Sequence, residues 1–444
     1  MVAPSPLEDL SRTGGIGGSS ALWQELEHAL FASGALEPPI PPIRDRKHDF
    51  VRDGVLMSDV DVQRAQQQLD SFMQLVPSYP SQAFAGEGIV TISGGLSYIA
   101  PSYVMLSMLR RCGCSLPVEM WFHSDELPPR PLRWEFENEL FANLRSFGEI
   151  SSAVDHGNFK GYKAKVIALL FSQFERVLWM DADNVPVMDV GKLLHTSEFA
   201  ETGAVFWKDV WFSSSAPDLW RIIRVPQSAH PSNAHESGQM AIDKRKGWRA
   251  LLLAMLFNMQ EPLYKRLMTN YLGQGDKESF PIAWLTLGLP YHLVQDAPTR
   301  IGQWSKSGGS AFLTRALGQR SPAGELAFVH NNVHKFDLAL PADFNHYQRR
   351  WNDFASLSAE EDSFTYLELN EHAGFDVEEE CFNALVRLRC KPWFDRYVAV
   401  RRRIIGEVGL FDLGRNAEYS VKGFKGVNLD DHAKVRHHAF RIRG

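Results

Sequence analysis

From residue 86 onward, short apolar runs alternate with longer stretches in which apolar residues recur at helical spacing. The runs of strand length lie at 88–95, 117–122 and 177–180. The stretches of helical spacing predict helices over 101–113, 131–147 and 163–174. Strands that alternate with helices of this length predict an α/β fold, in which helices cover both faces of a parallel sheet.

The pattern before residue 86 is different. Residues 1–20 are predicted to be a flexible leader, followed by a short helix at 21–33 and a proline-rich linker at 37–43. A further helix is predicted over 60–76, with Ser58 as its cap. Its buried face is predicted to consist of Val62, Ala65, Leu69, Phe72 and Met73.

After about residue 341 the alternation fades into helices and a basic tail, and a cluster of arginines lies at 401–403. We expect these basic segments to be solvent-exposed; contact with an anionic surface is the alternative. The chain is therefore predicted to have three parts: a leader and helical stem (1–85), an α/β domain (86–340) and a helical C-terminal extension with a basic tail (341–444).

Composition supports a packed globular protein, because 44% of the 444 residues are hydrophobic and 11% are aromatic. The net charge of −6 provides no general basic surface, so no nucleic-acid partner is expected. No apolar run approaches the roughly 18–20 residues that cross a bilayer, so no membrane span is expected either. The four cysteines lack zinc-site spacing and are expected to be reduced, with disulfides left open for a secreted chain.

The apolar run 177–180 ends in two carboxylates, Asp181 and Asp183. In extended backbone these two residues face the same side, at the carboxyl edge of the sheet where α/β proteins bind ligands. Two such carboxylates suit Mg²⁺ or Mn²⁺, and a cation there can neutralise the charge on a departing diphosphate, as in a sugar-nucleotide transferase. A solvated turn is the alternative interpretation.

A third ligand is predicted from a second strand end. His330 follows the apolar run 326–329, and Lys335 lies close behind it, suited as a compact cation to a diphosphate oxygen. A structural histidine is the alternative.

Seven segments in this order resemble the fungal α-mannosyltransferase family, whose best-known members are Golgi α-1,3-mannosyltransferases: GIVTISGG, LRRCGCSLPVEMWF, KAKVIALLFSQFERVLWMDADNVPVMD, TGAVFWKD, ESGQMAIDK, GDKESFPIAW and VHNNVHK. More distantly, they are similar to the glycogenin-like retaining glycosyltransferases. The resemblance covers about 86–340 and implies a GT-A fold, a sugar-nucleotide donor and a metal of the Mn²⁺ type (or Mg²⁺) on the Asp-x-Asp motif.

The resemblance also implies roles for individual residues. Asp181, Asp183 and His330 would be the metal ligands, and Asp181 would also contact the nucleotide. Lys335 would bind the diphosphate, although its spacing from His330 is one residue shorter than in the related group. The nucleoside would lie at 88–95, near Thr91 and Gly94, and the donor sugar or diphosphate near Lys163 or Lys165. The remaining candidates line the donor sugar: Glu236, Gln239, Asp276 and Lys277.

Simpler interpretations remain for some of these residues. Glu236 and Asp276 could be turn or helix caps. Trp207 and Trp211 are expected to pack in the core, with stacking on a sugar as the alternative. Residues 207–224 and 341–444 are predicted to form the acceptor pocket.

The sequence therefore predicts a metal-dependent, retaining glycosyltransferase that moves a hexose, with mannose from GDP-mannose favoured, to a hydroxyl of a glycan or small molecule. A front-face mechanism needs no protein base; a double displacement would use Glu236 or Asp276 as the nucleophile. The alternatives are a UDP-sugar donor, a nucleotidyltransferase, and a non-catalytic glycan-binding or scaffold protein. The resemblance implies the Golgi lumen, whereas a complete chain without an anchor would be cytoplasmic.

Overall fold

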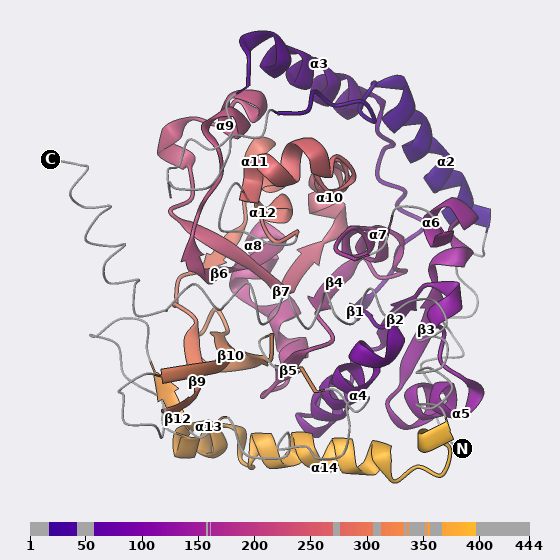
Figure 1. Cartoon of the computed structure of the whole chain (residues 1–444), viewed down its shortest axis with the longest axis vertical. Coiled ribbons are helices and arrows are strands. Elements are labelled where there is room, and N and C mark those ends of the chain that lie inside the picture. Colours follow the sequence, from indigo (N-terminus) through magenta and orange to yellow (C-terminus); the bar gives the residue numbers. More distant parts are fainter. Residues whose placement is uncertain are drawn as a thin grey trace, which may run out of the picture.

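A computed structural model describes residues 17–41, 57–156, 159, 161–269, 276–304, 312–332, 335–336, 351, 353–355 and 366–396. Its main sheet has the strand order β3-β2-β1-β4-β7-β6-β8 (Figure 1). These strands are β1 (Glu87–Ile92), β2 (Val118–Phe122), β3 (Ala142–Ser146), β4 (Arg176–Met180), β6 (Ala204–Phe212), β7 (Asn233–Asp243) and β8 (His292–Val294). All neighbouring pairs are parallel except those of β7, which runs antiparallel between β4 and β6.

A second, smaller sheet lies beside the first and has the order β12-β9-β10-β11-β5. It consists of β5 (Asn184–Pro186), β9 (Thr299–Trp304), β10 (Phe312–Arg320), β11 (Leu326–His330) and β12 (Asp353–Ala355). β5 and β11 are antiparallel, with His330 opposite Asn184. Because β5 begins directly after the Asp-x-Asp motif, this pairing brings the end of β11 to the end of β4.

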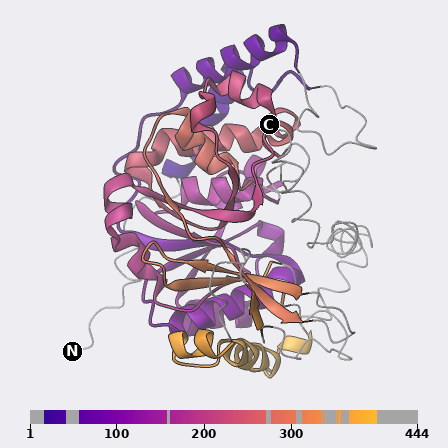
Figure 2. The ribbon, with the colours of Figure 1, turned by 90° about the vertical axis from the view of Figure 1, so that its left-hand side faces the viewer.

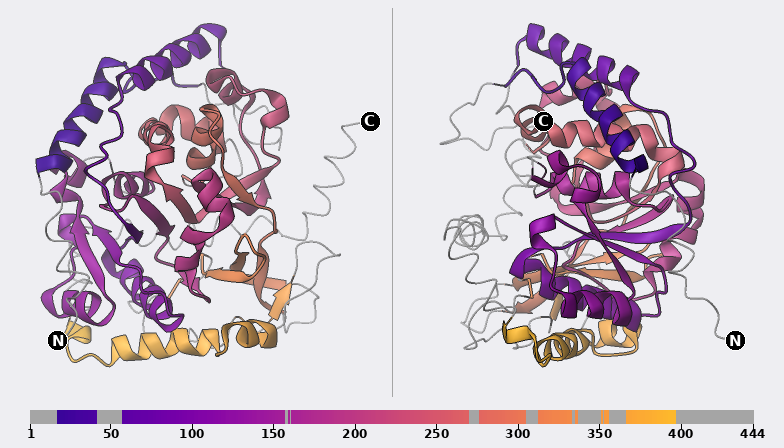
Figure 3. Two further views of the ribbon diagram at one scale, coloured as in Figure 1. Left: turned by 180° about the vertical axis from the view of Figure 1, so that it is seen from behind. Right: turned by 90° about the vertical axis from the view of Figure 1, so that its right-hand side faces the viewer.

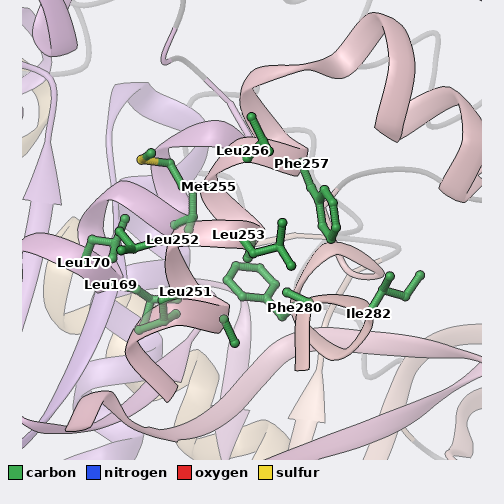
Figure 4. Packing of buried hydrophobic residues seen from close by; sticks show 14 of the residues in the cluster. Leu169, Leu170, Leu251, Leu252, Leu253, Met255, Leu256, Phe257, Phe280 and Ile282 are labelled. Atoms are coloured by element: carbon green, nitrogen blue, oxygen red, sulfur yellow. The ribbon is translucent and has the colours of Figure 1, made fainter. Parts of the chain in front are cut away.

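Alternate residues of each central strand point to opposite faces of the main sheet, as the strand period of two requires. In β4, Val177 and Trp179 lie in one core cluster, and Leu178 and Met180 lie in the other. The first cluster is covered by α7 (Lys163–Phe171), α10 (Lys244–Met259) and α12 (Ser279–Thr286), whose apolar side chains interlock (Figure 4). Figure 2 shows the sheet between this helical layer and the helices on its other face.

The second face is covered by α4 (Gly95–Arg111), against which α14 (Val377–Arg389) packs. The predicted α/β class, with a mostly parallel sheet and helices on both faces, is confirmed. Together with the antiparallel β7 and the second sheet, it is the GT-A arrangement that the resemblance implied.

Two sequence predictions about this region are wrong. The helix predicted over 131–147 is only a short α5 (Arg130–Trp134) and a π-helical turn that ends at Glu139, after which 142–146 forms β3. Phe141 has φ 52°, which breaks the helix, and pairing with β2 then outweighs the local helical spacing. The helix predicted from residue 101 begins at Gly95, so Pro101 lies inside it.

The N-terminal helices are α2 (Gly17–Ala32) and α3 (Asp59–Leu75). Ser58 caps α3 by accepting a hydrogen bond from the backbone of Asp61 (3.1 Å), as predicted. The predicted buried face of α3 is also confirmed, and its residues belong to the same core cluster as those of α7 and α10. α2 begins within the predicted leader, and Figure 3 shows both helices on the side of the molecule opposite α14.

The C-terminal helices are α13 (Tyr366–Ala373) and α14, and the basic segments at 401–403 and 422–443 lie outside the described residues. All four cysteines are unpaired thiols. Within the described ranges, no helix is both long and apolar enough to cross a membrane. The proposed boundaries at 85 and 340 stay predictions.

Candidate metal-binding site

The Asp-x-Asp turn connects β4 to β5. Its backbone is hydrogen-bonded to β7 and to the residue that follows β11. The amide of Asp181 donates to the carbonyl of Gly238 in β7 (2.8 Å), and the amide of Asn331 donates to the carbonyl of Asp183 (2.9 Å). The Asn184 side chain donates to Gly238 as well (2.9 Å). The turn is therefore held between the main sheet and the second sheet.

The structure brings together the three predicted metal ligands. One ligand atom each from Asp181, Asp183 and His330 lies within 4.8 Å of the other two, and His330 Nε2 is 3.4 Å from Asp183 Oδ1. The side chain of Asp181 is 28% exposed, whereas those of Asp183 and His330 are 6% and 7% exposed, so the cluster opens on the Asp181 side. Two carboxylates and an imidazole fit Mn²⁺, and Mg²⁺ less closely because of the nitrogen ligand.

The charges of this cluster are coupled. Burial alone raises the pKa of Asp183, but Lys335 and His330 outweigh it and hold that pKa below its usual value. Burial lowers the pKa of His330, but Glu236 and Asp183 outweigh it and hold the pKa well above its usual value. A bound cation would replace the imidazolium proton.

Lys335 faces the Asp183 oxygen that His330 does not contact. Its Nζ is 3.0 Å from Asp183 Oδ2, donates to the Tyr98 hydroxyl at 3.2 Å and sits 4.3 Å from the centre of the Tyr98 ring. The side chain remains one-third exposed. A cation in this position can reach an anionic group that also contacts the metal.

Lys165 is buried on the other side of the cluster. Its Nζ is 3.1 Å from Asp181 Oδ1 and 3.4 Å from Asp276 Oδ1, and it donates to the Ser237 carbonyl at 2.9 Å. Burial lowers its pKa, but the two aspartates outweigh burial and raise it. Lys165 therefore joins three segments of the site. Lys163 instead pairs with Glu261 (3.3 Å), beyond the end of α10.

The segment before α12 contributes the other predicted polar groups. Asp276 is buried and accepts a hydrogen bond from the Ser237 hydroxyl (3.2 Å). Its carboxylate does not cap α12, so the capping interpretation is wrong for its side chain. Burial raises its pKa, and Lys165 offsets part of that rise. Lys277 forms an ion pair with the buried Asp209 of β6.

Two further candidates come from β7. Gln239 is fully buried, and its side-chain oxygen accepts a hydrogen bond from Asn184 (2.7 Å), beneath the Asp-x-Asp turn. Glu236 accepts hydrogen bonds from the amides of Ser237 and Gly238 and lies 3.5 Å from His330 Nδ1. Burial raises the pKa of Glu236, but His330 outweighs burial and lowers it to about 2.

The predicted nucleoside residues lie at the end of β1, which neighbours β4 in the sheet. Thr91 is buried, and its hydroxyl has no hydrogen-bond partner among the described residues. Gly94 lets the Glu126 side chain approach the backbone closely, because a Cβ there would lie 2.2 Å from Glu126 Oε2. Trp207 is fully buried in the core, as expected, and Trp211 is half-buried.

Sequence reasoning missed several contributors: Tyr98, Asp209, His235, Ser237 and Glu278. Glu278 accepts hydrogen bonds from the backbone (2.9 Å) and the ring (2.9 Å) of His235, and so ties the start of α12 to β7. The pairing of β6 with β7 and the return of the chain at 276 bring in Asp209, His235, Ser237 and Glu278, whereas Tyr98 comes from α4. The motifs ESGQ and GDKES were the one available signal, since Ser237 and Glu278 lie within them.

Comparisons with known proteins point to one family. The family model described as "Mannosyltransferase putative" matches residues 86–232 and 222–321. Alpha-1,2-mannosyltransferase MNN21 of Candida albicans is 27% identical over 299 residues, which cover 56% of this chain and 45% of that protein. Alpha-1,2-mannosyltransferase MNN5 of Saccharomyces cerevisiae is 27% identical over 280 residues, which cover 50% of this chain and 46% of that protein.

The chain thus spans about half the length of these curated relatives. Among solved structures, the glycosyltransferase GlyE of Streptococcus pneumoniae TIGR4 overlaps with a TM-score of 0.32 and 14% identity, covering 47% of this chain and 45% of that one. An overlap at this level says nothing about activity.

Proposed function

Because the chain belongs to this mannosyltransferase family, whose model spans more than half of it, we propose that it is a metal-dependent transferase that moves mannose from GDP-mannose to a hydroxyl of a glycan. The resemblance to fungal α-mannosyltransferases is confirmed at the family level. The two relatives described above carry the name α-1,2 rather than the α-1,3 of the expected best-known members. We therefore propose an α-1,2 linkage.

One observation carries the proposal: Asp181, Asp183 and His330 meet at the carboxyl end of β4, with Lys335 beside them. These three residues would hold Mn²⁺ or Mg²⁺. The bound cation would supply charge neutralisation for the departing diphosphate. Lys335 would exchange part of its contact with Asp183 for a diphosphate oxygen, which a compact ammonium group suits.

The remaining predicted residues are proposed to bind the donor around this point. Thr91 and Gly94 at the end of β1 would receive the nucleoside. Asp276 and Lys277 would contact hydroxyls of the mannose. Lys165 would hold Asp276 in place, and Gln239 would hold the Asp-x-Asp turn through Asn184. Lys163 is paired with Glu261, so it would affect the diphosphate only through its long-range electrostatic potential.

The reaction is proposed to retain the configuration of the anomeric carbon. The bond between that carbon and the diphosphate oxygen breaks, the acceptor oxygen forms a bond on the same face, and the acceptor proton passes to the diphosphate oxygen that leaves. Hydrogen-bond donors and cations beside the departing diphosphate would stabilise its developing negative charge, and a carboxylate near the anomeric carbon would stabilise the positive charge of an oxocarbenium-like transition state. In a double displacement, Asp276 would be the nucleophile.

Donor hydrolysis tests this function. The protein is incubated with Mn²⁺ and a panel of GDP-, UDP- and ADP-sugars, with and without α-mannoside acceptors, and the free nucleoside diphosphate is quantified. We expect release from GDP-mannose that needs metal and is lost in Asp183→Asn. Release from a UDP-sugar instead would overturn the donor assignment. Pyrophosphate from a nucleoside triphosphate would indicate a nucleotidyltransferase, and binding without turnover a glycan-binding or scaffold protein.

A further inference from the structure

We propose that Glu236 is a positioning residue for the metal ligand His330, and that Gly238 provides the space in which the imidazole sits. This inference rests on the metal site of the proposed function. It assigns to Glu236 a task other than the sugar contact or nucleophile role that the sequence predicted.

The imidazole of His330 lies between two carboxylates. Its Nε2 is 3.4 Å from Asp183 Oδ1, on the side of the metal cluster, and its Nδ1 is 3.5 Å from Glu236 Oε1, on the opposite side. A metal-bound imidazole is neutral and carries one proton, on the nitrogen that does not bind the metal. Glu236 is placed to accept that proton's hydrogen bond, which would direct Nε2 towards the cation. Such carboxylate–histidine–metal arrangements fix both the tautomer and the ring orientation.

The carboxylate of Glu236 is itself held in place. Its Oε1 accepts hydrogen bonds from the amides of Ser237 (2.9 Å) and Gly238 (2.8 Å) in the same strand. The residue is buried, and its strand is fixed by pairing with β4, where Met180 lies opposite Gln239. The oxygen that faces His330 is therefore held by two backbone amides, and is poorly available to a sugar hydroxyl.

Gly238 completes this arrangement. A Cβ at this position would lie 2.6 Å from His330 Cε1 and 2.7 Å from Nδ1. Side-chain atoms do not approach this closely, so an alanine would push the ring away from β7. The consecutive residues 236–238 thus supply both the acceptor for His330 and the room for its ring.

Calorimetric titration of Mn²⁺ into the full chain, without donor, tests the inference. Removing an outer partner of a metal ligand typically weakens binding by about 10–100-fold, and we expect Glu236→Ala to do so. Glu236→Gln, which retains an accepting oxygen, should weaken binding less. Gly238→Ala should weaken it as Glu236→Ala does. Glu119→Gln is the matched control, because Glu119 is an equally buried carboxylate that lies in β2 and pairs with Arg145 instead of a histidine of the metal cluster; it should bind Mn²⁺ as the unmodified protein does.

Turnover distinguishes positioning from direct action on the sugar. If Glu236 positions His330, saturating Mn²⁺ should restore most of the turnover number in Glu236→Gln. Unchanged Mn²⁺ affinity in both Glu236 variants, or a turnover loss that saturating Mn²⁺ does not restore, would overturn the inference.

If the unmodified protein binds no Mn²⁺, both the inference and the proposed function fail. If it binds Mn²⁺ with the expected dependence on Glu236 but transfers no sugar, only the proposed function fails. Thermal unfolding of each variant shows whether the fold is kept, and the milder Glu236→Gln provides the test if Glu236→Ala does not fold.

Discussion

Two buried lysines lie near opposite ends of β4 and have opposite electrostatic behaviour. Lys165, at the carboxyl end, lies between Asp181 and Asp276, which raise its pKa against the effect of burial. Lys244, at the amino end, donates to the carbonyl (2.6 Å) and the hydroxyl (2.8 Å) of Ser172. Burial lowers the pKa of Lys244 well below its usual value, and Glu119 offsets this only in part.

The difference shows what neighbours do at equal burial. Carboxylates near Lys165 keep it cationic, so it can balance the charge of a site that collects anions. The hydrogen bonds of Lys244 go to neutral acceptors of Ser172, with Glu119 acting only at longer range, and its Nζ lies 4.0 Å from the centre of the Phe84 ring. We infer that the carboxyl end of β4 is built for ionic ligands and the amino end for packing.

The largest effect is expected from Lys165→Met. The substitution leaves Asp181 and Asp276 close together without their shared cation, and breaking a buried ion pair costs roughly 3–5 kcal/mol of unfolding free energy. Donor turnover should fall at least as steeply, because the Asp-x-Asp turn loses its link to Asp276. Urea unfolding and donor hydrolysis measure the two effects. A variant that is as stable and as active as the unmodified protein would remove the distinction between the two ends.

Lys244→Met should have a smaller effect, confined to stability. It leaves the acceptors of Ser172 unpaired, at a cost of about 1–3 kcal/mol, while the methionine retains most of the apolar packing. Turnover per folded molecule should be unchanged, since Lys244 lies at the amino end of β4. A large loss of turnover in the folded variant would contradict the assignment of this end to packing.

The pH dependence of stability sharpens the contrast further. Because the folded pKa of Lys244 is depressed, the unfolded chain binds more protons than the folded one between that pKa and the unfolded value near 10.5. The unfolding free energy should therefore rise with pH in this window, by at most ~1.4 kcal/mol per pH unit, and Lys244→Met should lack that contribution. Urea unfolding at several pH values, set against the same series for the variant, measures it. The groups that face Lys244 are Glu119 and Arg145, and parallel curves for the two proteins would show that Lys244 stays charged.

Lys335→Met should give the smallest change in stability, because this lysine is one-third exposed and His330 remains beside Asp183 to balance its charge. Its effect should appear in donor binding, since the diphosphate would lose a cation. We expect a raised KM for the donor, with thermal unfolding close to that of the unmodified protein. An unchanged KM would show that Lys335 only pairs with Asp183.

The carboxyl end of β4 could be predicted largely from the sequence. Asp181 and Asp183 follow a buried strand, and His330 follows another, so strand ends alone suggested that they meet. The order of strands could not be predicted. β7 enters antiparallel between β4 and β6, and only this pairing carries Glu236 to His330 and brings Asp209 towards Lys277.

Long-range pairing also explains the wrong helix at 131–147. Its apolar spacing is helical, yet residues 142–146 gain more from pairing with β2 than from one more helical turn. Lys165 and Lys244 make the same point for side chains. Each lies in or just before an apolar helical stretch, and nothing local shows which one will meet carboxylates.

The most direct test of mannosyl transfer is the product itself. The protein, GDP-α-mannose, Mn²⁺ and an α-mannoside acceptor are incubated together, and the new linkage is identified by NMR, with Asp183→Asn alongside. We expect an α-linked mannose on the 2-hydroxyl of the acceptor, formed only by the unmodified protein and only with metal. A β-linked product would contradict retention, and equal product from the Asp183→Asn variant would contradict the role given to the carboxylates at the end of β4.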